Sequence, residues 1–181
     1  MRIKEWDYYL VLNEDFAGAF TLSDDGYIGL QSVSLLNFKE GWEHTETILN
    51  AFPMGKMQMP SDSRHGDIVY RDKRLHMEYT LEEGQRRIRC KFDNFYQGKT
   101  FRCDITLVQP KMDTMVIATQ WKERKQHFII IRRSIVCRQK VRWNMMEKYI
   151  DLIRVLILEL WIGDAVYGLM IIAGTGVPAI R

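Results

Sequence analysis

The chain has 181 residues, of which 46% are hydrophobic and 27% are charged, and it holds 12 glycines and 4 prolines. These values exclude a disordered, collagen-like or low-complexity protein and leave room for one globular domain, or at most one and a half. The net charge of +3 is too small to indicate nucleic acid or an anionic membrane surface as a partner, and the 3 cysteines indicate neither a disulfide scaffold nor a zinc ribbon. Since no basic and then apolar leader is present, the sequence favours a cytoplasmic location.

Alternating apolar and polar residues predict an antiparallel β-protein over the first part of the chain. Outside the central region, strands are expected at 6–12, 16–22, 27–36, 45–51, 67–70 and 114–119, separated by turn-forming residues. Many short strands at this spacing indicate part of a barrel or a sandwich. Residues 52–65, which include Pro53, Gly55 and Pro60, are expected to form a long irregular loop, and such loops often carry function.

Three strands in the middle of the chain fit a single antiparallel register. Opposed residues in such a pair have position numbers with a constant sum. Leu75 and Phe92 sum to 167, as do the pairs that follow, which centres the first turn on residues 83 and 84. Phe92 and Phe101 sum to 193, which centres the second turn on residues 96 and 97. Cys90 and Cys103 then oppose each other on the apolar face, where reduced thiols serve as small fillers.

Five segments follow one another along the chain: IKEWDYY at 3–9, SDDGYIGL at 23–30, FPMG at 52–55, KFDNF at 91–95, and MVIAT at 115–119 with HF at 127–128. In this order they resemble the bacterial domain-of-unknown-function family numbered 2804. The resemblance implies a mostly β-fold, related to lipocalin-like proteins such as the carotenoid hydratases, with no established activity. Family members carry a segment before the WDYY run, so the amino end of this chain is expected to be short.

After residue 128 the resemblance stops. The family pattern continues with Tyr-Tyr-Asn-Gln and later with Leu-Asp-Trp-Gly-Arg-Gly. Where the family has Tyr-Tyr-Asn-Gln, this chain has the residues Ile129 to Arg133. Residues 129–181 hold 8 of the 26 basic and 4 of the 23 acidic residues, a shift in charge balance without a linker. If one base were lost from the gene at Phe128, reading 160–175 in the neighbouring frame would permit Leu-Asp-Trp-Gly-Arg-Gly and an aromatic run. We therefore hypothesise a frameshift.

Under this hypothesis the chain divides into an antiparallel β domain at 1–128 and an out-of-frame tail at 129–181 without a domain of its own. The tail is expected to be ill-defined and partly helical, with a helical pattern over 148–162. The charge-free run 165–180 is shorter than the ~18–20 residues of a membrane helix, so no membrane span is expected. The chain as written is expected to be poorly soluble and inactive, because a truncated sheet exposes an edge and its core.

Six residues are candidates for ligand binding. Trp6, Tyr8 and Tyr9, together with Asp7, place aromatic rings on both faces of the first strand, so at least one ring faces a partner or a ligand cavity; for Trp6 a core position is the simpler interpretation. The hydroxyl of Tyr27, near Asp24 or Asp25, could relay a proton, although a surface turn explains it better.

Asp93 and Asn94, at the end of a strand, could point into the mouth of a barrel, or could cap a turn. Arg86, close to the first hairpin turn, is interpreted as part of a solvated basic face rather than a phosphate site. The 4 histidines lack ligand spacing and no nucleotide-binding or hydrolase motif is present, so neither a metal nor another cofactor is expected.

Two functions remain open. The first is the binding of a hydrophobic small molecule or lipid by a barrel-like protein. The alternative is a hydratase- or isomerase-like enzyme acting on an apolar substrate, for which inward-facing carboxylates would supply acid–base groups. The discriminating observation is whether an Asp or Arg lies inside an enclosed pocket with Tyr27 or Asp7. Inward-facing carboxylates would favour catalysis, and a purely apolar lining would favour carriage. The sequence does not indicate the oligomeric state.

Overall fold

The structure, a computed structural model, describes residues 3–12, 14–60, 65–82, 84–108, 115–123, 127–137, 139–144 and 154–164. Within these ranges the chain forms strands and no helix, which confirms the mostly β, antiparallel class. The strands are β1 (Lys4–Leu12), β2 (Phe16–Asp24), β3 (Ile28–Asn37), β4 (Trp42–Ala51), β5 (Ile68–Arg71), β6 (Leu75–Glu82), β7 (Gln85–Tyr96), β8 (Lys99–Val108), β9 (Met115–Gln120), β10 (His127–Cys137), β11 (Gln139–Asn144) and β12 (Arg154–Asp164).

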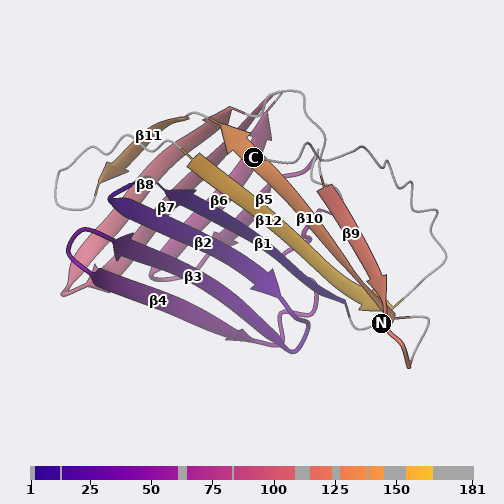
Figure 1. Cartoon of the computed structure of the whole chain (residues 1–181). Coiled ribbons are helices and arrows are strands. Elements are labelled where there is room, and N and C mark those ends of the chain that lie inside the picture. Colours follow the sequence, from indigo (N-terminus) through magenta and orange to yellow (C-terminus); the bar gives the residue numbers. More distant parts are fainter. Residues whose placement is uncertain are drawn as a thin grey trace.

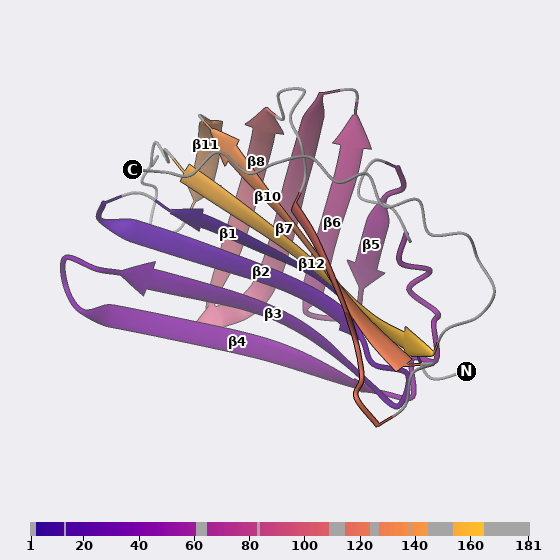
Figure 2. The same cartoon turned by 45° about the vertical axis from the view of Figure 1, so that its right-hand side comes forward.

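The strands form two antiparallel sheets (Figure 1). The first has seven strands in the order β4-β3-β2-β1-β12-β10-β9, and the second has five in the order β11-β8-β7-β6-β5. Figure 2 shows the strands of the second sheet running steeply across those of the first. Among the described residues no ladder joins one sheet to the other, so the two sheets do not form a closed barrel there.

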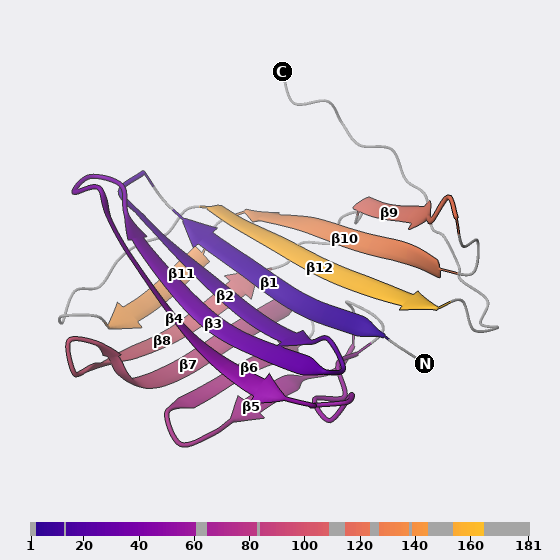
Figure 3. The same cartoon turned by 90° about the horizontal axis from the view of Figure 1, so that it is seen from below.

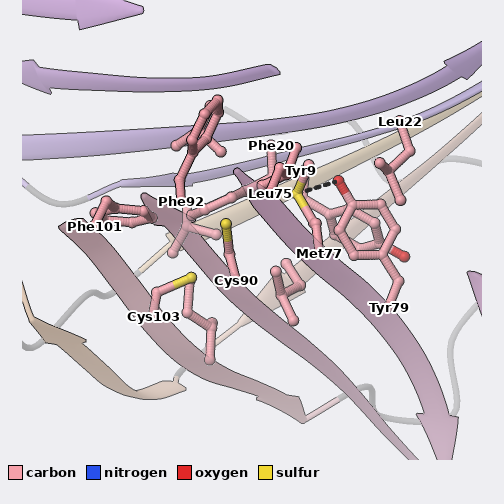
Figure 4. Close-up of a cluster of buried hydrophobic side chains, with 14 of the residues drawn as sticks. Tyr9, Phe20, Leu22, Leu75, Met77, Tyr79, Cys90, Phe92, Phe101 and Cys103 are labelled. Atoms are coloured by element: carbon pink, nitrogen blue, oxygen red, sulfur yellow. Dashed lines mark hydrogen bonds between the residues drawn. The ribbon is translucent and has the colours of Figure 1, made fainter. Parts of the chain in front are cut away.

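A single hydrophobic core lies between the two sheets. Figure 3 shows β1 to β4 lying over β5 to β8, whereas β9 and β10 extend away from the second sheet. The alternation of each strand puts every second side chain on the inner face, where it is removed from water. The first sheet contributes Tyr9, Val11, Phe20, Leu22, Val33 and Leu35, and the second contributes Ile68, Leu75, Met77, Tyr79, Ile88, Cys90, Phe92, Phe95, Phe101, Cys103, Ile105 and Leu107 (Figure 4).

The register predicted for the central strands is confirmed. Leu75 pairs with Phe92, and Phe92 in turn pairs with Phe101, as the constant sums require. Cys90 and Cys103 are directly opposite each other and buried, and both are free thiols. One apolar face shared by three strands is therefore readable from the sequence, because a slip by one residue would turn every one of these side chains to solvent.

The second turn lies one residue later than the sequence predicts. β7 extends to Tyr96, which pairs with Lys99, and the ladder shifts register between Phe92 and Tyr96. Asn94, within this irregular stretch, has a φ of 53°, and the turn itself is made by Gln97 and Gly98 with φ of 50° and 78°. Positive φ at both central residues is what a two-residue hairpin of the type I′ class needs, and the bulge supplies the change of register.

The C-terminal part differs from the expectation of a partly helical tail. Residues 154–162 of the expected helix belong to strand β12, which pairs with β1 on one side and with β10 on the other. The run VLILELWI is apolar almost throughout, so it fits strand and helix periods equally, and two adjacent strands supply a ladder on each side. Residues 145–153 and the apolar run 165–180 lie outside the described residues.

Strand β10 runs through Phe128, the position where the frameshift hypothesis divides the chain. The first sheet therefore continues on both sides of that position, through β10 and β12. A strand can form from any sufficiently apolar sequence, so the hypothesis about the gene stays a prediction.

Candidate functional site

A buried arginine is the main polar feature of the inner face. The side chain of Arg86 is only 5% exposed, and its Nη1 donates a hydrogen bond to the hydroxyl oxygen of Tyr9 at 2.8 Å. The bond joins β7 to β1 and thus one sheet to the other. The interpretation of Arg86 as part of a solvated face is therefore wrong. Arg86 and Ile88 are two residues apart in β7 and so lie on the same face of the sheet. The register that predicted an inward-facing Ile88 could therefore have predicted an inward-facing Arg86 as well.

Two further groups accompany this bond. The rings of Tyr9 and Tyr79 meet edge to face with their centroids 4.6 Å apart (Figure 4). Burial raises the pKa of Tyr79 well above its usual value of 10.0, and the nearby Tyr9 and Asp7 raise it further. Asp7 has the same parity as Tyr9 and Val11, whose side chains are buried, so it belongs to the inner face. We call Asp7, Tyr9, Tyr79 and Arg86 the inner polar cluster.

Of the candidates on the first strand, only Asp7 belongs to this cluster. Trp6 and Tyr8 have the opposite parity and lie half-buried on the other face of the first sheet. Burial raises the pKa of the Tyr8 phenol above its usual value. The expectation of aromatic side chains on both faces of β1 is confirmed, and the ring that faces the interior is Tyr9.

Tyr27 lies in the β2–β3 turn and is exposed. Its hydroxyl is 3.4 Å from Lys4 Nζ, which donates to it, and that ammonium also sits 5.1 Å from the ring centroid. The carboxylate of Asp24 is occupied elsewhere, because its two oxygens accept bonds from the backbone N–H groups of Gly26 and Gly55 at 2.9 and 2.8 Å. The geometry is that of a surface turn, the interpretation that the sequence favoured.

Asp93 and Asn94 shape the bulge in β7. Asp93 Oδ2 accepts a bond from Lys91 Nζ at 2.7 Å and Oδ1 accepts one from Thr100 at 3.0 Å, and these bonds lower the pKa of the Asp93 carboxyl. The backbone oxygens of Asp93 and Asn94 both accept bonds from the Arg74 guanidinium. This is the turn-capping role that the sequence offered as the alternative.

The candidate residue Tyr27 and the candidate pair Asp93 and Asn94 lie far apart in the structure. The bulge is next to Phe95, whose carbonyl accepts a bond from His44 Nε2 at 2.7 Å near the start of β4. Tyr27 is joined to Phe52, just past the end of β4, through a backbone bond of 2.9 Å. Since His44 and Phe52 are eight residues apart along an extended strand, the two groups are roughly 25 Å apart.

A polar network that the sequence did not indicate supports the loop after β4. Gln31 is fully buried; its Nε2 donates to the carbonyl of Ser23 at 3.1 Å and contacts Met57 Sδ at 3.5 Å. Its Oε1 accepts from Asn50 Nδ2 at 2.7 Å, and Asn50 Oδ1 accepts from the Tyr70 hydroxyl at 2.9 Å. The network ties β3, β4 and β5 to the loop. A polar residue inside an alternating strand, Gln31 between Leu30 and Ser32, gave no distinct signal.

The opposite end of the core is closed by aromatic rings. His44 packs against Phe95 and Tyr96 with ring centroids 4.9 and 4.8 Å apart, and Trp42 meets Tyr96 at 5.2 Å. In the part of the chain that the structure describes, no three His, Cys, Asp or Glu side chains are grouped as metal ligands would be. No helix among the described residues is long and apolar enough to cross a bilayer.

Comparison with known families gives one match. Residues 1–151 match the model of the family described as Domain of unknown function (DUF2804), so the match covers most of the chain and continues past residue 128. The chain belongs to the DUF2804 family. Separate comparisons with curated proteins and with solved structures found no match. The family match thus establishes to which family the chain belongs, and the chemistry of the chain has to be inferred from its residues.

Proposed function

We propose that this DUF2804 protein binds a hydrophobic small molecule or lipid between its two sheets, in the manner of barrel-like binding proteins, and that the inner polar cluster holds the polar end of the ligand. The observation that carries the proposal is the buried Arg86–Tyr9 bond, which places a guanidinium on the inner face beside the apolar core. Removing a guanidinium from water is unfavourable unless it is paired, and an apolar residue of similar volume would fill the core at lower cost. The buried guanidinium therefore supports a ligand whose polar end is acidic.

The chemistry of the ligand follows from this arrangement. Small-molecule sites are mainly apolar, with a few polar groups that fix the orientation of the ligand. A guanidinium favours carboxylate or phosphate, with which it forms charge-assisted bonds. Met57 and Met59 pack against the core from the loop after β4, and methionine adapts its shape readily to an apolar guest. A fatty acid or a similar anionic lipid combines these properties.

We also propose a cytoplasmic location. The two buried cysteines of the core are opposite each other and remain free thiols. Unpaired cysteines in this position are typical of proteins that fold in a reducing compartment.

The binding test uses a polarity-sensitive fluorescent probe that is displaced by palmitate or by hexadecanol, which share a chain and differ in the head group. In a chain with its reading frame restored after codon 128, we expect palmitate to displace the probe and Arg86→Met to weaken palmitate about tenfold or more while leaving hexadecanol unchanged. Arg87→Met is the matched control, because Arg87 faces outward and pairs with Asp104. If Arg86→Met does not fold, Tyr9→Phe serves in its place. The proposal would be overturned if neither palmitate nor hexadecanol displaced the probe, or if Arg86→Met and Arg87→Met weakened palmitate binding equally.

The same titration applied to the chain as written tests the expectation that this chain is inactive. Binding by the restored chain alone would confirm that expectation. Binding by both chains would contradict it and would leave the proposed ligand class in place.

One observation favours the alternative of a hydratase- or isomerase-like enzyme. Asp7 is an inner-face carboxylate beside the phenol of Tyr79, whose raised pKa keeps it protonated. A carboxylate as base and a phenol as acid are a plausible acid–base pair for a double bond in an apolar substrate. The two functions differ in what is recovered: a carrier returns its ligand unchanged, whereas an enzyme returns it isomerised or heavier by one water, as mass spectrometry and chromatography would show. Asp7→Asn would abolish that conversion.

A further inference from the structure

Three large apolar side chains project into solvent at one end of the first sheet. Tyr27 in the β2–β3 turn is 59% exposed, and Phe52 and Met54 in the loop after β4 are 68% and 69% exposed. The start of β1, the β2–β3 turn and the end of β4 meet at this end (Figure 1). We call Tyr27, Phe52 and Met54 the tip patch.

The two loops that carry the tip patch are bonded to each other. The N–H of Phe52 donates to the carbonyl of Tyr27 at 2.9 Å, and the N–H of Met54 donates to the carbonyl of Gly26 at 3.0 Å. The carboxylate of Asp24 accepts from a backbone N–H of each loop. The three side chains therefore form one rigid feature and not three separate loop residues.

The loop is anchored to the sheet by its inward-facing residues. Pro53, between Phe52 and Met54, is buried, and its Cγ lies 3.2 Å from the place where a Cβ on Gly29 would be. Farther along the loop, Met57 contacts Gln31. Because Pro53 is directed into the protein, its two neighbours are directed out of it.

The backbone conformation supports a functional reason for this exposure. Phe52 and Met54 have φ of 53° and 54°, a region that bulky residues rarely occupy. Conformations of this kind persist where the surroundings enforce them, and they occur preferentially at functional sites. Here the enforced conformation presents two apolar side chains to water, which would be unfavourable in a free protein unless something covers them.

Cations accompany the tip patch. The Lys4 ammonium lies over the Tyr27 ring, and Lys56 is exposed two residues after Met54. Of the acidic residues nearby, Asp24 is buried and its oxygens are bonded, and Asp25 and Glu5 are half-buried. Aromatic rings with lysines beside them are typical of the membrane–water interface, where the ring enters the head-group region and the ammonium meets anionic lipid.

We propose that the tip patch inserts into the surface of an anionic lipid bilayer and docks the protein there. The patch is small, since it consists of three side chains on two loops, whereas a stable protein interface requires roughly 800 Å² on each partner. Bilayer insertion has no such requirement of area, because each apolar side chain that leaves water contributes by itself. The inference goes beyond the proposed function, as docking needs no ligand between the sheets. The net charge of +3 for the whole chain did not indicate membrane docking, because the lysines that matter are the two beside the tip patch.

The test is co-sedimentation of the full chain with phosphatidylcholine vesicles, with and without phosphatidylserine. We expect binding to the phosphatidylserine vesicles and a loss of about tenfold or more in the double variant Phe52→Ser with Met54→Ser. Lys4→Gln with Lys56→Gln should remove most of the dependence on phosphatidylserine and on salt. The matched control is Phe38→Ser, since Phe38 is also exposed but lies in the β3–β4 turn at the other end of the sheet.

Two results would overturn the proposal. One is wild-type protein that stays in the supernatant with both kinds of vesicle, including the case in which it self-associates through Phe52 and Met54, which would assign the patch to a second copy of the chain. The other is a Phe38→Ser variant that loses as much binding as the double variant. Circular dichroism and thermal melts that match the wild type show that the variants are folded, so that a loss of binding reports on the surface.

Discussion

At the scale of single residues, the charge on the inner face is the feature with most consequence. Arg86 was predictable from parity along β7, since it shares the inner face with Ile88, yet its neighbours Arg87 and Arg89 made the segment look like a solvated basic face. Charge and periodicity conflict at this one residue. Periodicity determined the position of Arg86, because the register of the strand decides on which face of the sheet each side chain lies.

Replacing Tyr9 by Phe should destabilise the fold. The change removes the hydroxyl that accepts a bond from Arg86 and leaves a buried donor with one acceptor fewer, which costs about 1–3 kcal/mol of unfolding free energy. Urea denaturation measures the loss. Tyr8→Phe is the matched control, because Tyr8 lies on the opposite face and is expected to change stability by less than about 0.5 kcal/mol. Equal losses in the two variants would contradict the role assigned to Tyr9.

The buried thiols should be unreactive in the folded protein. Burial and the neighbouring Cys90 raise the pKa of Cys103 well above its usual value. In a Cys137→Ser background, Ellman's reagent should therefore detect neither thiol at pH 8 until the protein is unfolded. Since the unfolded chain releases the thiol proton first, stability should fall as the pH rises above about 8.5, and less so after Cys103→Ala. Rapid labelling of the native protein would show that the pair is exposed.

At the scale of elements, the central hairpins were readable and their irregularities were not. Alternation and the constant sum of position numbers determine which residues of β6, β7 and β8 are opposed. The sum does not predict where one strand carries an extra residue. The bulge before Tyr96 shifts the turn to Gln97 and Gly98, and its stabilising partner, Arg74, comes from another hairpin. Such long-range contacts cannot be read from local pattern. The same is true of the loop after β4, whose support from Gln31 depends on three strands.

The position of β12 can be tested with a proline. Leu158 pairs with Tyr8 of β1 and with Arg133 of β10, in the middle of the first sheet. Leu158→Pro removes a ladder donor and should lower the unfolding free energy by about 2–4 kcal/mol, whereas Leu158→Val keeps the ladder and should cost about 1 kcal/mol. Thermal denaturation of the two variants measures the difference. Indistinguishable melting temperatures would mean that β12 does not hold the sheet together.

At the scale of the whole molecule, the class and most strands could be predicted, whereas the pairing of the sheet across its centre could not. The strand order places β12 between β1 and β10, a pairing between segments about 150 residues apart that no local signal announces. For this reason the residues 154–162 of the expected helix form a strand instead. An apolar run without a clear period takes the structure that its neighbours in space impose.

The reading frame is a property of the gene, and its prediction is checked there. The nucleotide sequence around codon 128 should show a run of T from which one base is missing relative to the family. Restoring that base should raise the fraction of soluble protein on expression several-fold, because the restored strands belong to the selected core. An intact frame in an independent reading, or a sharp cooperative melt of the 181-residue product, would contradict the hypothesis.

The place of β12 also governs how the molecule can assemble during synthesis. Strands β1 to β4 can pair as soon as they leave the ribosome, but the free side of β1 has to wait until residues 154–164 have been made. At ordinary elongation rates that wait lasts about 10–30 seconds. Throughout it, a nine-residue strand with the aromatic run Trp6, Tyr8 and Tyr9 offers unpaired backbone groups to any other nascent chain, so a holding chaperone would be needed most at this stage.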